Sequence, residues 1–314
     1  MNALSDALFG TFVPRLFAFV VAFGLFACGG DQKSPPAAPA LSSQTDVIPP
    51  DLDWVVRIDI GRVRSALGPS MLAMLRDKAL RKDDDGAALF LTDALERTNV
   101  LVVATRFDGT TLADAVLSLS GDFKGMDPRA YRAVPPWGPP IDLGGDVRRY
   151  DRKKPKARSD VMRLYLGSTD VIVAATEAEL DSLEAVLENG APSNRLKPRE
   201  RGFLSAAFRL RLARRNERFP ELSQAFASVR SFEGFADTAG EGFRVEVTAE
   251  LESDAAASHA KSLLEAARAA FDDQGGRMSS LAHHTTVEAQ GPFVVVRAEL
   301  VREVLGDLVG EALR

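Results

Sequence analysis

The most constraining feature of this sequence is an uncharged apolar run, residues 16–27, that ends at the only cysteine of the chain, Cys28. A helix needs about 20 apolar residues to cross a bilayer, so the run is short for a permanent span and has the length of a signal-peptide core. Arg15 gives the preceding segment the weakly basic character of export signals. A lone cysteine forms no internal disulfide and supplies no multi-thiolate metal site. The sequence therefore predicts export and a body that folds without disulfides.

The residues at the end of the apolar run, Leu25, Phe26, Ala27 and Cys28, resemble the lipobox of bacterial lipoproteins. In that family signal peptidase II removes the peptide before the cysteine, which carries a diacylglyceryl group, and the new amino terminus is usually acylated, typically with palmitate. The resemblance implies that residues 1–27 are a signal peptide, recognised through Leu25, Phe26 and Ala27, and that Cys28 is lipidated. Two or three acyl chains anchor a protein stably, at about 0.8 kcal/mol per buried methylene. The alternative is an ordinary signal peptide, or an uncleaved anchor, with a chance cysteine.

Residues 28–48 contain little that builds a core and are rich in proline, alanine and serine. This composition is typical of a flexible tether, and about 20 such residues have a reach of roughly 25 Å. In Gram-negative lipoproteins an aspartate directly after the cysteine often retains the protein in the inner membrane, whereas this chain has Gly29. The resemblance thus implies a cell-envelope protein, attached to a membrane through acyl chains on Cys28, with the outer membrane favoured.

The first half of the body, residues 49–192, begins with a period-two alternation at 54–60 that predicts a half-buried strand. A helix and two strand pairs follow, at about 65–80, 99–107 with 113–120, and 162–166 with 171–175. Asp108-Gly109 suits the first of these turns. Thr176 and Glu179 have the spacing of a capping box, and Gly190 marks the end of the helix that they begin.

The second half, residues 193–314, repeats this order of elements. We expect a strand, a helix, a hairpin, a helix, a hairpin and a final helix, at about 208–212, 220–228, 229–237 with 243–251, 254–272, 285–289 with 292–300, and 301–312. The similarity lies in element order and hardly at all in residue identity. The sequence predicts a diverged duplication of strand, helix, hairpin, helix, hairpin and helix.

Hairpins that alternate with helices predict an α+β fold with largely antiparallel sheets and helices on one face. The other face is expected to meet water and to carry alternating charges: Arg57, Asp59, Arg163, Arg209, Arg211, Arg244, Glu246, Arg297 and Glu299. Such a face is either simply solvated, or it binds a partner or ligand through bidentate arginine contacts to carboxylates or phosphates.

A basic stretch lies before the second predicted strand pair, with Tyr150 among its charges: Arg148, Arg149, Arg152, Lys153, Lys154, Lys156 and Arg158. Near a membrane, each such residue gains about 1 kcal/mol from anionic head groups. The stretch is therefore a candidate head-group or partner contact, and the alternative is a solvated flexible loop. Further basic residues lie at 195–201 and 209–218. Just upstream, Trp137 either packs on the core or is an exposed contact.

A search for catalytic or metal-binding motifs returns little. His259, His283 and His284 do not have the spacing that places two ligands on one metal. The acidic turn at 83–86 fails as a calcium loop, because Arg81 and Thr92 would occupy the first and last ligand positions. The sequence has no nucleophile elbow, phosphate loop or dinucleotide motif. We therefore expect no cofactor, no metal and no enzymatic activity.

Composition further reduces the number of function classes that fit this chain. The chain is 46% hydrophobic and 26% charged, with a net charge of -5, which describes a globular protein and gives no argument for binding nucleic acid. The favoured hypothesis is a non-catalytic binding or scaffolding body, with another envelope protein as the candidate partner. One alternative is a carrier or sensor of a lipid, which requires a large apolar pocket. A less favoured alternative is a hydrolase, which requires a histidine within about 3 Å of a serine or carboxylate.

Overall fold

The computed structural model describes residues 47–67, 87–108, 111–131, 136–144, 147–153, 161–167, 171–190, 193, 195–209, 228–240, 242–272 and 282–301. These residues form two compact units, an N-terminal unit that ends at Lys197 and a C-terminal unit that begins at Pro198. Within each unit every described strand pairing is antiparallel. The predicted α+β class with antiparallel sheets is confirmed.

The N-terminal unit contains a run of strands in the order β1-β2-β3-β7-β6-β5-β4. Their bounds are β1 Trp54–Asp59, β2 Thr98–Asp108, β3 Thr111–Gly121, β4 Ile141–Asp142, β5 Val147–Asp151, β6 Val161–Gly167 and β7 Val171–Thr176. The helices are α3 Ile60–Leu67, α5 Ala87–Arg97, the 3-10 turn η2 Glu177–Glu179, and α6 Leu180–Asn189. The strand at 54–60 and the pairs β2 with β3 and β6 with β7 agree with the sequence pattern, whereas α5, β4 and β5 were not predicted.

The burial of strand β6 contradicts the predicted exposure of Arg163. All seven of its residues are buried, which means that both faces of the sheet are covered at this strand. Arg163, which the alternation assigned to a water-facing position, is only 4% exposed. A period-two pattern identifies the face on which a side chain lies but not what packs on that face. Arg57 and Asp59 on β1 are half-buried and lie near each other.

The predicted capping box at the start of α6 is wrong. The Thr176 side chain makes no capping hydrogen bond, and its hydroxyl instead accepts one from the Ala115 N–H at 3.1 Å. Glu179 is fully buried and accepts a hydrogen bond from Arg106 Nε at 2.8 Å. The same guanidinium reaches Asp51 Oδ2 at 2.6 Å. A buried carboxylate is costly unless a positive charge neutralises it, and Arg106 of β2 supplies that charge to Glu179. The ion pair therefore holds η2 against β2.

The end of α6 agrees with the prediction. Gly190 has φ 81°, a region that residues with a side chain rarely adopt, and its N–H donates to the Val186 carbonyl at 2.8 Å. Glycine therefore terminates this helix because it alone adopts the required backbone conformation without strain.

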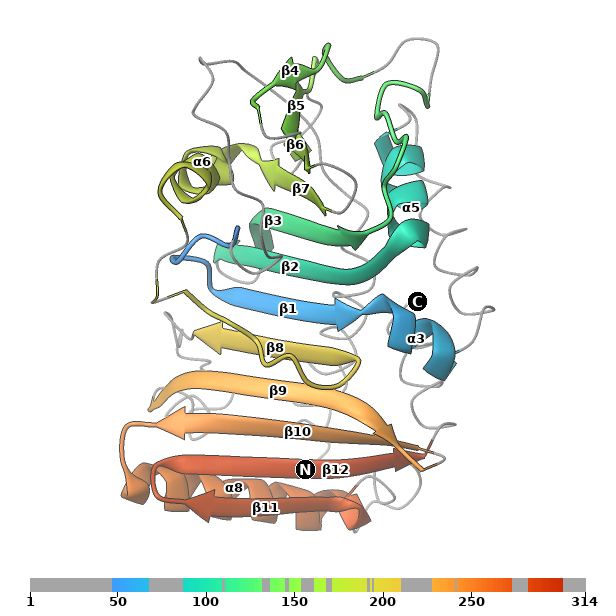
Figure 1. The fold of residues 1–314 in the computed structure, drawn as a ribbon. Helices are drawn as coiled ribbons and strands as arrows, with labels where there is room; N and C mark the ends of the chain where they lie inside the picture. The colour runs from blue at the N-terminus through green and yellow to red at the C-terminus, as the bar shows by residue number, and fades with distance from the viewer. Residues whose placement is uncertain are drawn as a thin grey trace. The chain divides into compact units, whose positions relative to one another are not determined.

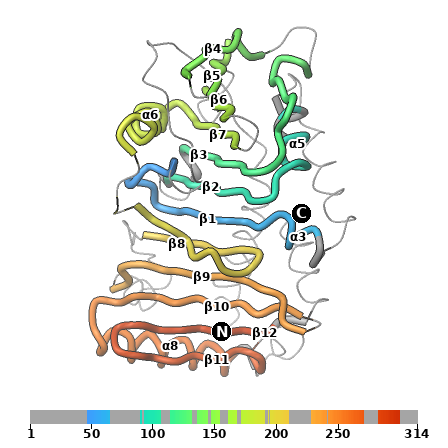
Figure 2. The backbone as a smooth tube through the Cα atoms, viewed as in Figure 1, coloured from blue at the N-terminus to red at the C-terminus, as the bar shows by residue number. Residues whose placement is uncertain are grey.

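The C-terminal unit contains strands in the order β11-β12-β10-β9-β8, drawn from yellow to red in Figure 1. Their bounds are β8 Leu204–Arg209, β9 Val229–Ala239, β10 Gly242–Leu251, β11 Thr285–Gln290 and β12 Phe293–Val301, with helix α8 at Asp254–Asp272. Figure 2 follows the backbone through the hairpins β9-β10 and β11-β12. Both hairpins and α8 agree with the sequence pattern. Strand β8 begins earlier than predicted, and the helices expected at 220–228 and 301–312 lie outside the described residues, apart from Ser228 in a turn and Val301 at the end of β12.

Helix α8 packs on one face of this sheet, which we call the inner face. Its Ala257 is fully buried beside Ala249, Leu251 and Val294, and Phe232 and Val287 pack against this cluster. Along β11 the exposure of successive residues alternates strictly, as expected for a strand with one covered and one open face. We call the opposite side of the same sheet the outer face.

The fold predicts a strong effect at Gly121. A Cβ atom at this position would lie 2.1 Å from the Arg97 carbonyl oxygen, a backbone atom that cannot move aside cheaply. We expect Gly121→Ala to lower the free energy of unfolding by about 1–3 kcal/mol, measured by urea denaturation. The matched control is Gly61→Ala in α3, where the nearest atom lies at 3.4 Å and alanine favours the helix. Equal effects of the two substitutions would contradict the close approach at Gly121.

Candidate functional site

The outer face of the C-terminal sheet is the part of the described surface where polar groups from several strands converge. Strand register brings Glu246 of β10 opposite Phe235 of β9 and Arg297 of β12. The next position on the same face brings Thr248 opposite Glu233. These side chains share one face because alternate residues of each strand point the same way.

Arg297 connects three strands on this face. Its Nε lies 2.9 Å from Glu246 Oε2 and its Nη1 lies 2.8 Å from Glu288 Oε2 of β11. Hydrogen bonding to Arg297, together with its charge, lowers the pKa of Glu288. Arg244 and Glu299 form a further cross-strand pair at 3.1 Å. Apart from Glu246, which is partly buried, these groups are exposed or half-exposed, so the pairs contribute little to stability and mainly determine which charges the surface presents.

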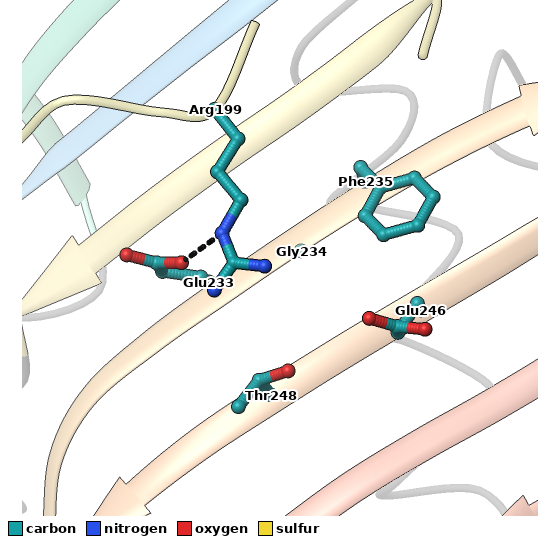
Figure 3. Close-up of a pocket in the computed structure, with 6 residues that line it drawn as sticks. All are labelled: Arg199, Glu233, Gly234, Phe235, Glu246 and Thr248. Atoms are coloured by element: carbon teal, nitrogen blue, oxygen red, sulfur yellow. Dashed lines mark hydrogen bonds and ion pairs between the residues drawn. The ribbon is translucent and has the colours of Figure 1, made fainter. Parts of the chain in front are cut away.

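A pocket opens beside these pairs, lined by Arg199, Glu233, Gly234, Phe235, Glu246 and Thr248 (Figure 3). Arg199 comes from the segment before β8, and its Nε lies 2.8 Å from Glu233 Oε2. About half of the Arg199 side chain is exposed, which leaves its guanidinium accessible from solvent. The Arg201 guanidinium lies 4.2 Å from the centre of the Phe235 ring, in cation–π geometry.

The pocket has room for no more than about one water molecule, so a polar or charged group would contact its rim. A planar guanidinium recognises carboxylate or phosphate through paired hydrogen bonds, while Glu233 and Glu246 offer acceptors to a cation. Sequence reasoning named Glu246 and Arg297 on this face and placed Arg199 and Arg201 in a basic stretch. It missed Glu233, Phe235 and Thr248, because only strand register shows which residues of β9 and β10 are opposite one another.

The seven basic residues that the sequence predicted as contacts differ in their exposure where the structure describes them. Arg148 and Lys153 are exposed, whereas Arg149 and Arg152 are 2% and 4% exposed. Lys154, Lys156 and Arg158 lie outside the described residues. Arg148 and Arg149 are in β5, so this part of the stretch is a strand and not a loop. Successive residues of a strand point to opposite faces, and here the side chain of Arg149 is covered whereas that of Arg148 is exposed.

Arg149 belongs to a buried ion cluster between β5, β6 and α6. Arg163 Nε donates to Asp151 Oδ1 at 2.6 Å, and Nη1 of the same guanidinium donates to Glu184 of α6. Arg149 Nη2 lies 3.2 Å from Asp151 Oδ2, and the Tyr165 hydroxyl donates to Glu184 at 3.2 Å. Burial raises the pKa of Tyr165, which stays a neutral donor. Two guanidinium groups thus face two carboxylates, and the cluster is balanced in charge.

Trp137, which the sequence analysis expected either in the core or at an exposed contact, lies in the core. It is fully buried and forms an isolated antiparallel bridge with Arg152, whose guanidinium lies 5.7 Å from the centre of its ring. An indole ring attracts a cation to its face, and this contact accounts for the burial of Arg152, whereas the next residue, Lys153, is exposed.

The remaining predicted positions carry no site in the described structure. The three histidines, His259, His283 and His284, are exposed. Among the described residues no cluster of histidine, cysteine, aspartate or glutamate side chains suits a metal ion. Leu25, Phe26, Ala27 and Cys28 lie outside the described ranges. In the part of the chain that the structure describes, no helix has the length and apolar character needed to cross a bilayer.

Comparison with known proteins shows a similarity in fold to solved structures. No protein-family model matches the sequence, and curated proteins give no match. Two solved structures of the protein TP0453 are similar in fold. Crystal form III has a TM-score of 0.51 and 9% identity and matches 86% of this chain and 98% of its own. Crystal form I has a TM-score of 0.50 and 8% identity and matches 88% and 100%. At this identity the likeness concerns the fold alone.

The buried ion cluster predicts unequal effects of two neighbouring arginines. Replacing Arg163 removes one of the two cations that neutralise Asp151 and Glu184, so we expect Arg163→Met to lower the free energy of unfolding by about 3–5 kcal/mol. The matched control is Arg148→Met on the paired strand, where the side chain is exposed and the change should stay within about 0.5 kcal/mol. Urea denaturation of both variants measures the difference, and similar losses would contradict a structural role for the cluster.

Proposed function

We propose that this protein is a lipid-anchored lipoprotein of the bacterial cell envelope, whose α+β body binds or scaffolds a partner and catalyses no reaction. The observation that carries the anchoring is the position of Cys28, the only thiol of the chain, directly after an apolar run and a lipobox-like triplet. Gly29 at the following position supports the outer membrane as the location. A tether over residues 28–46 would give the body a reach of roughly 25 Å from the bilayer. Val47 and Ile48, which the sequence analysis assigned to the tether, are instead buried in the body.

The outer face of the C-terminal sheet is the surface that we propose for partner binding. It presents charges of both signs in fixed pairs, and the pocket beside Arg199 adds a guanidinium that is half exposed. Such a surface suits a polar protein partner, because complementary charge pairs give specificity at a solvated interface.

Two finer features of the fold also belong to this proposal. The arrangement with helices on one face and charges on the other is proposed for the C-terminal unit, where α8 packs on the inner face. A duplication would account for the shared order of a strand followed by a hairpin, as in β1 with β2 and β3, and in β8 with β9 and β10.

Head-group contact by the basic stretch is a secondary proposal. Within the described residues it rests on Arg148 and Lys153, which are exposed. Arg149 and Arg152 are taken up by interactions inside the N-terminal unit and are not part of it.

The anchor is tested by replacing its cysteine. Expression of the full chain in a Gram-negative bacterium should give a mature protein that begins at Cys28, carries acyl mass and fractionates with membranes. In Cys28→Ala the acyl mass should disappear and the uncleaved precursor should accumulate, because the modified thiol is what signal peptidase II requires. Intact mass spectrometry and membrane fractionation give the two readouts.

Gly29→Ala is the matched control, because it changes the neighbouring residue and keeps the thiol. Its acylation and membrane fractionation should equal those of the wild type. A wild-type protein without acyl mass, or an identical product from wild type and Cys28→Ala, would overturn the proposed lipidation.

The binding surface is tested by photo-crosslinking in cells. A photoreactive amino acid at position 244, on the outer face, should form a crosslink to one discrete envelope protein, identified by mass spectrometry. The control places the same amino acid at position 268, which is exposed on α8. Crosslinks of the same proteins from both positions, or none from position 244, would contradict recognition through the outer face.

A further inference from the structure

The edge of the C-terminal sheet at β11 has main-chain hydrogen-bonding groups that point away from the sheet. The Glu299 N–H donates to the His284 carbonyl at 3.1 Å, which makes His284 and Glu299 a hydrogen-bonded pair. Register continues this ladder through Thr286 with Arg297 and Glu288 with Val295. In an antiparallel ladder hydrogen-bonded pairs alternate with pairs that are not bonded. The N–H and carbonyl groups of Val287 and Ala289 therefore face outward.

The same parity appears on the other side of β12. The Leu251 N–H donates to the Pro292 carbonyl at 2.8 Å, so alternate residues from Pro292 onward face β10 and the intervening ones, such as Val295 and Arg297, face β11. Within the described ranges no strand pairs with the outward side of β11, which ends the strand order of this unit (Figure 1).

This edge lacks most of the usual features that keep sheet edges apart and carries one charged side chain, Glu288. Proteins protect an exposed edge with proline, lysine, a bulge or a very short strand. Strand β11 is six residues long, its register with β12 is regular, and its sequence Thr-Thr-Val-Glu-Ala-Gln contains neither proline nor lysine. In contrast, the terminal strand β4 of the N-terminal unit has two residues and follows Pro139 and Pro140. The described end strand β4 is therefore short and preceded by prolines, whereas β11 is neither.

The residues of β11 are also compatible with pairing to an identical strand. In an antiparallel arrangement centred on Val287, each Thr286 lies opposite the Glu288 of the other copy. The single charge of the strand thus avoids its own counterpart, and each Glu288 is already neutralised by Arg297 at 2.8 Å. Like charges directly opposite would oppose pairing, and none occur in this register.

We propose that two copies of this chain associate through their β11 edges, joining the two C-terminal sheets into one antiparallel sheet with Val287 on the two-fold axis. A two-fold contact uses the same residues twice and closes on itself, which gives a dimer and not an open polymer. The proposal goes beyond the proposed function and does not depend on lipidation.

Sedimentation of the chain from residue 28 onward, with Cys28→Ala to remove acyl groups and thiols, tests the association. We expect a dimer at concentrations of tens of micromolar, and we expect Val287→Pro to weaken it roughly tenfold or more. Proline removes an outward N–H that β12 does not use, so an edge position tolerates it. Val287→Ala is the matched control, because it loses the same side-chain packing and keeps the N–H. A monomeric wild-type chain, or equal weakening by both variants, would overturn the proposal.

A disulfide experiment gives an answer even if Val287→Pro fails to fold. In the proposed register positions 286 and 288 of the two copies form a pair without main-chain hydrogen bonds, where Cα atoms lie about 4.5 Å apart and a disulfide fits. Thr286→Cys combined with Glu288→Cys, in the Cys28→Ala background, should form a covalent dimer on mild oxidation. Each single variant should form far less. Equal yields from single and double variants would overturn the proposed register and with it the edge-to-edge dimer.

Discussion

The antiparallel strand is the constraint on which the rest of this structure depends. Each strand must satisfy its backbone N–H and carbonyl groups through its neighbours, and its pleat sends successive side chains to opposite faces. In the C-terminal unit this geometry sorts Val287, Val294 and Ala249 toward α8 and sorts Glu288, Arg297 and Glu246 toward solvent. The charged face and its pocket both follow from the same alternation.

Arginine serves opposite purposes in the two units. In the N-terminal unit, Arg163 and Arg149 are buried and neutralised by Asp151 and Glu184, and their contribution is to hold α6 on the sheet. Removing one partner of such a pair is costly because the other stays buried and charged. In the C-terminal unit, Arg297 is partly exposed, so its pairs stabilise little and remain available to a partner. The surroundings, and not the residue type, decide which purpose is served.

The proposed anchor and the proposed dimer would act together. A tether from Cys28 holds each copy near one membrane, which raises the local concentration of one copy around another without any new contact. Pairing along β11 would leave the outer face open, because the edge uses main-chain groups whereas the outer face uses side chains. Two outer faces would then be presented on one continuous sheet, which suits a scaffold.

Several elements were predictable from the sequence because they depend on local patterns. The alternation at 243–251 and the helical spacing at 254–272 identified β10 and α8, and Gly190 marked the end of α6 through its positive φ. The anchor at Cys28 is also a local pattern, set by a short run of residues.

Features that depend on contacts between distant residues were not predictable. Thr176 and Glu179 had the spacing of a capping box, yet Glu179 pairs with Arg106, which lies 73 residues away. Arg163 was assigned to a water-facing position because alternation does not show that α6 packs on that face. Arg149 was assigned to a basic stretch that contacts head groups or is solvated. Likewise, the residues that line the pocket could be identified only from the register of β9 against β10. The sequence by itself determined many of the elements, the faces of the C-terminal strands and the proposed anchor. Only the tertiary structure decided which charges are buried and which strands lie side by side, because these depend on the three-dimensional neighbours of each strand.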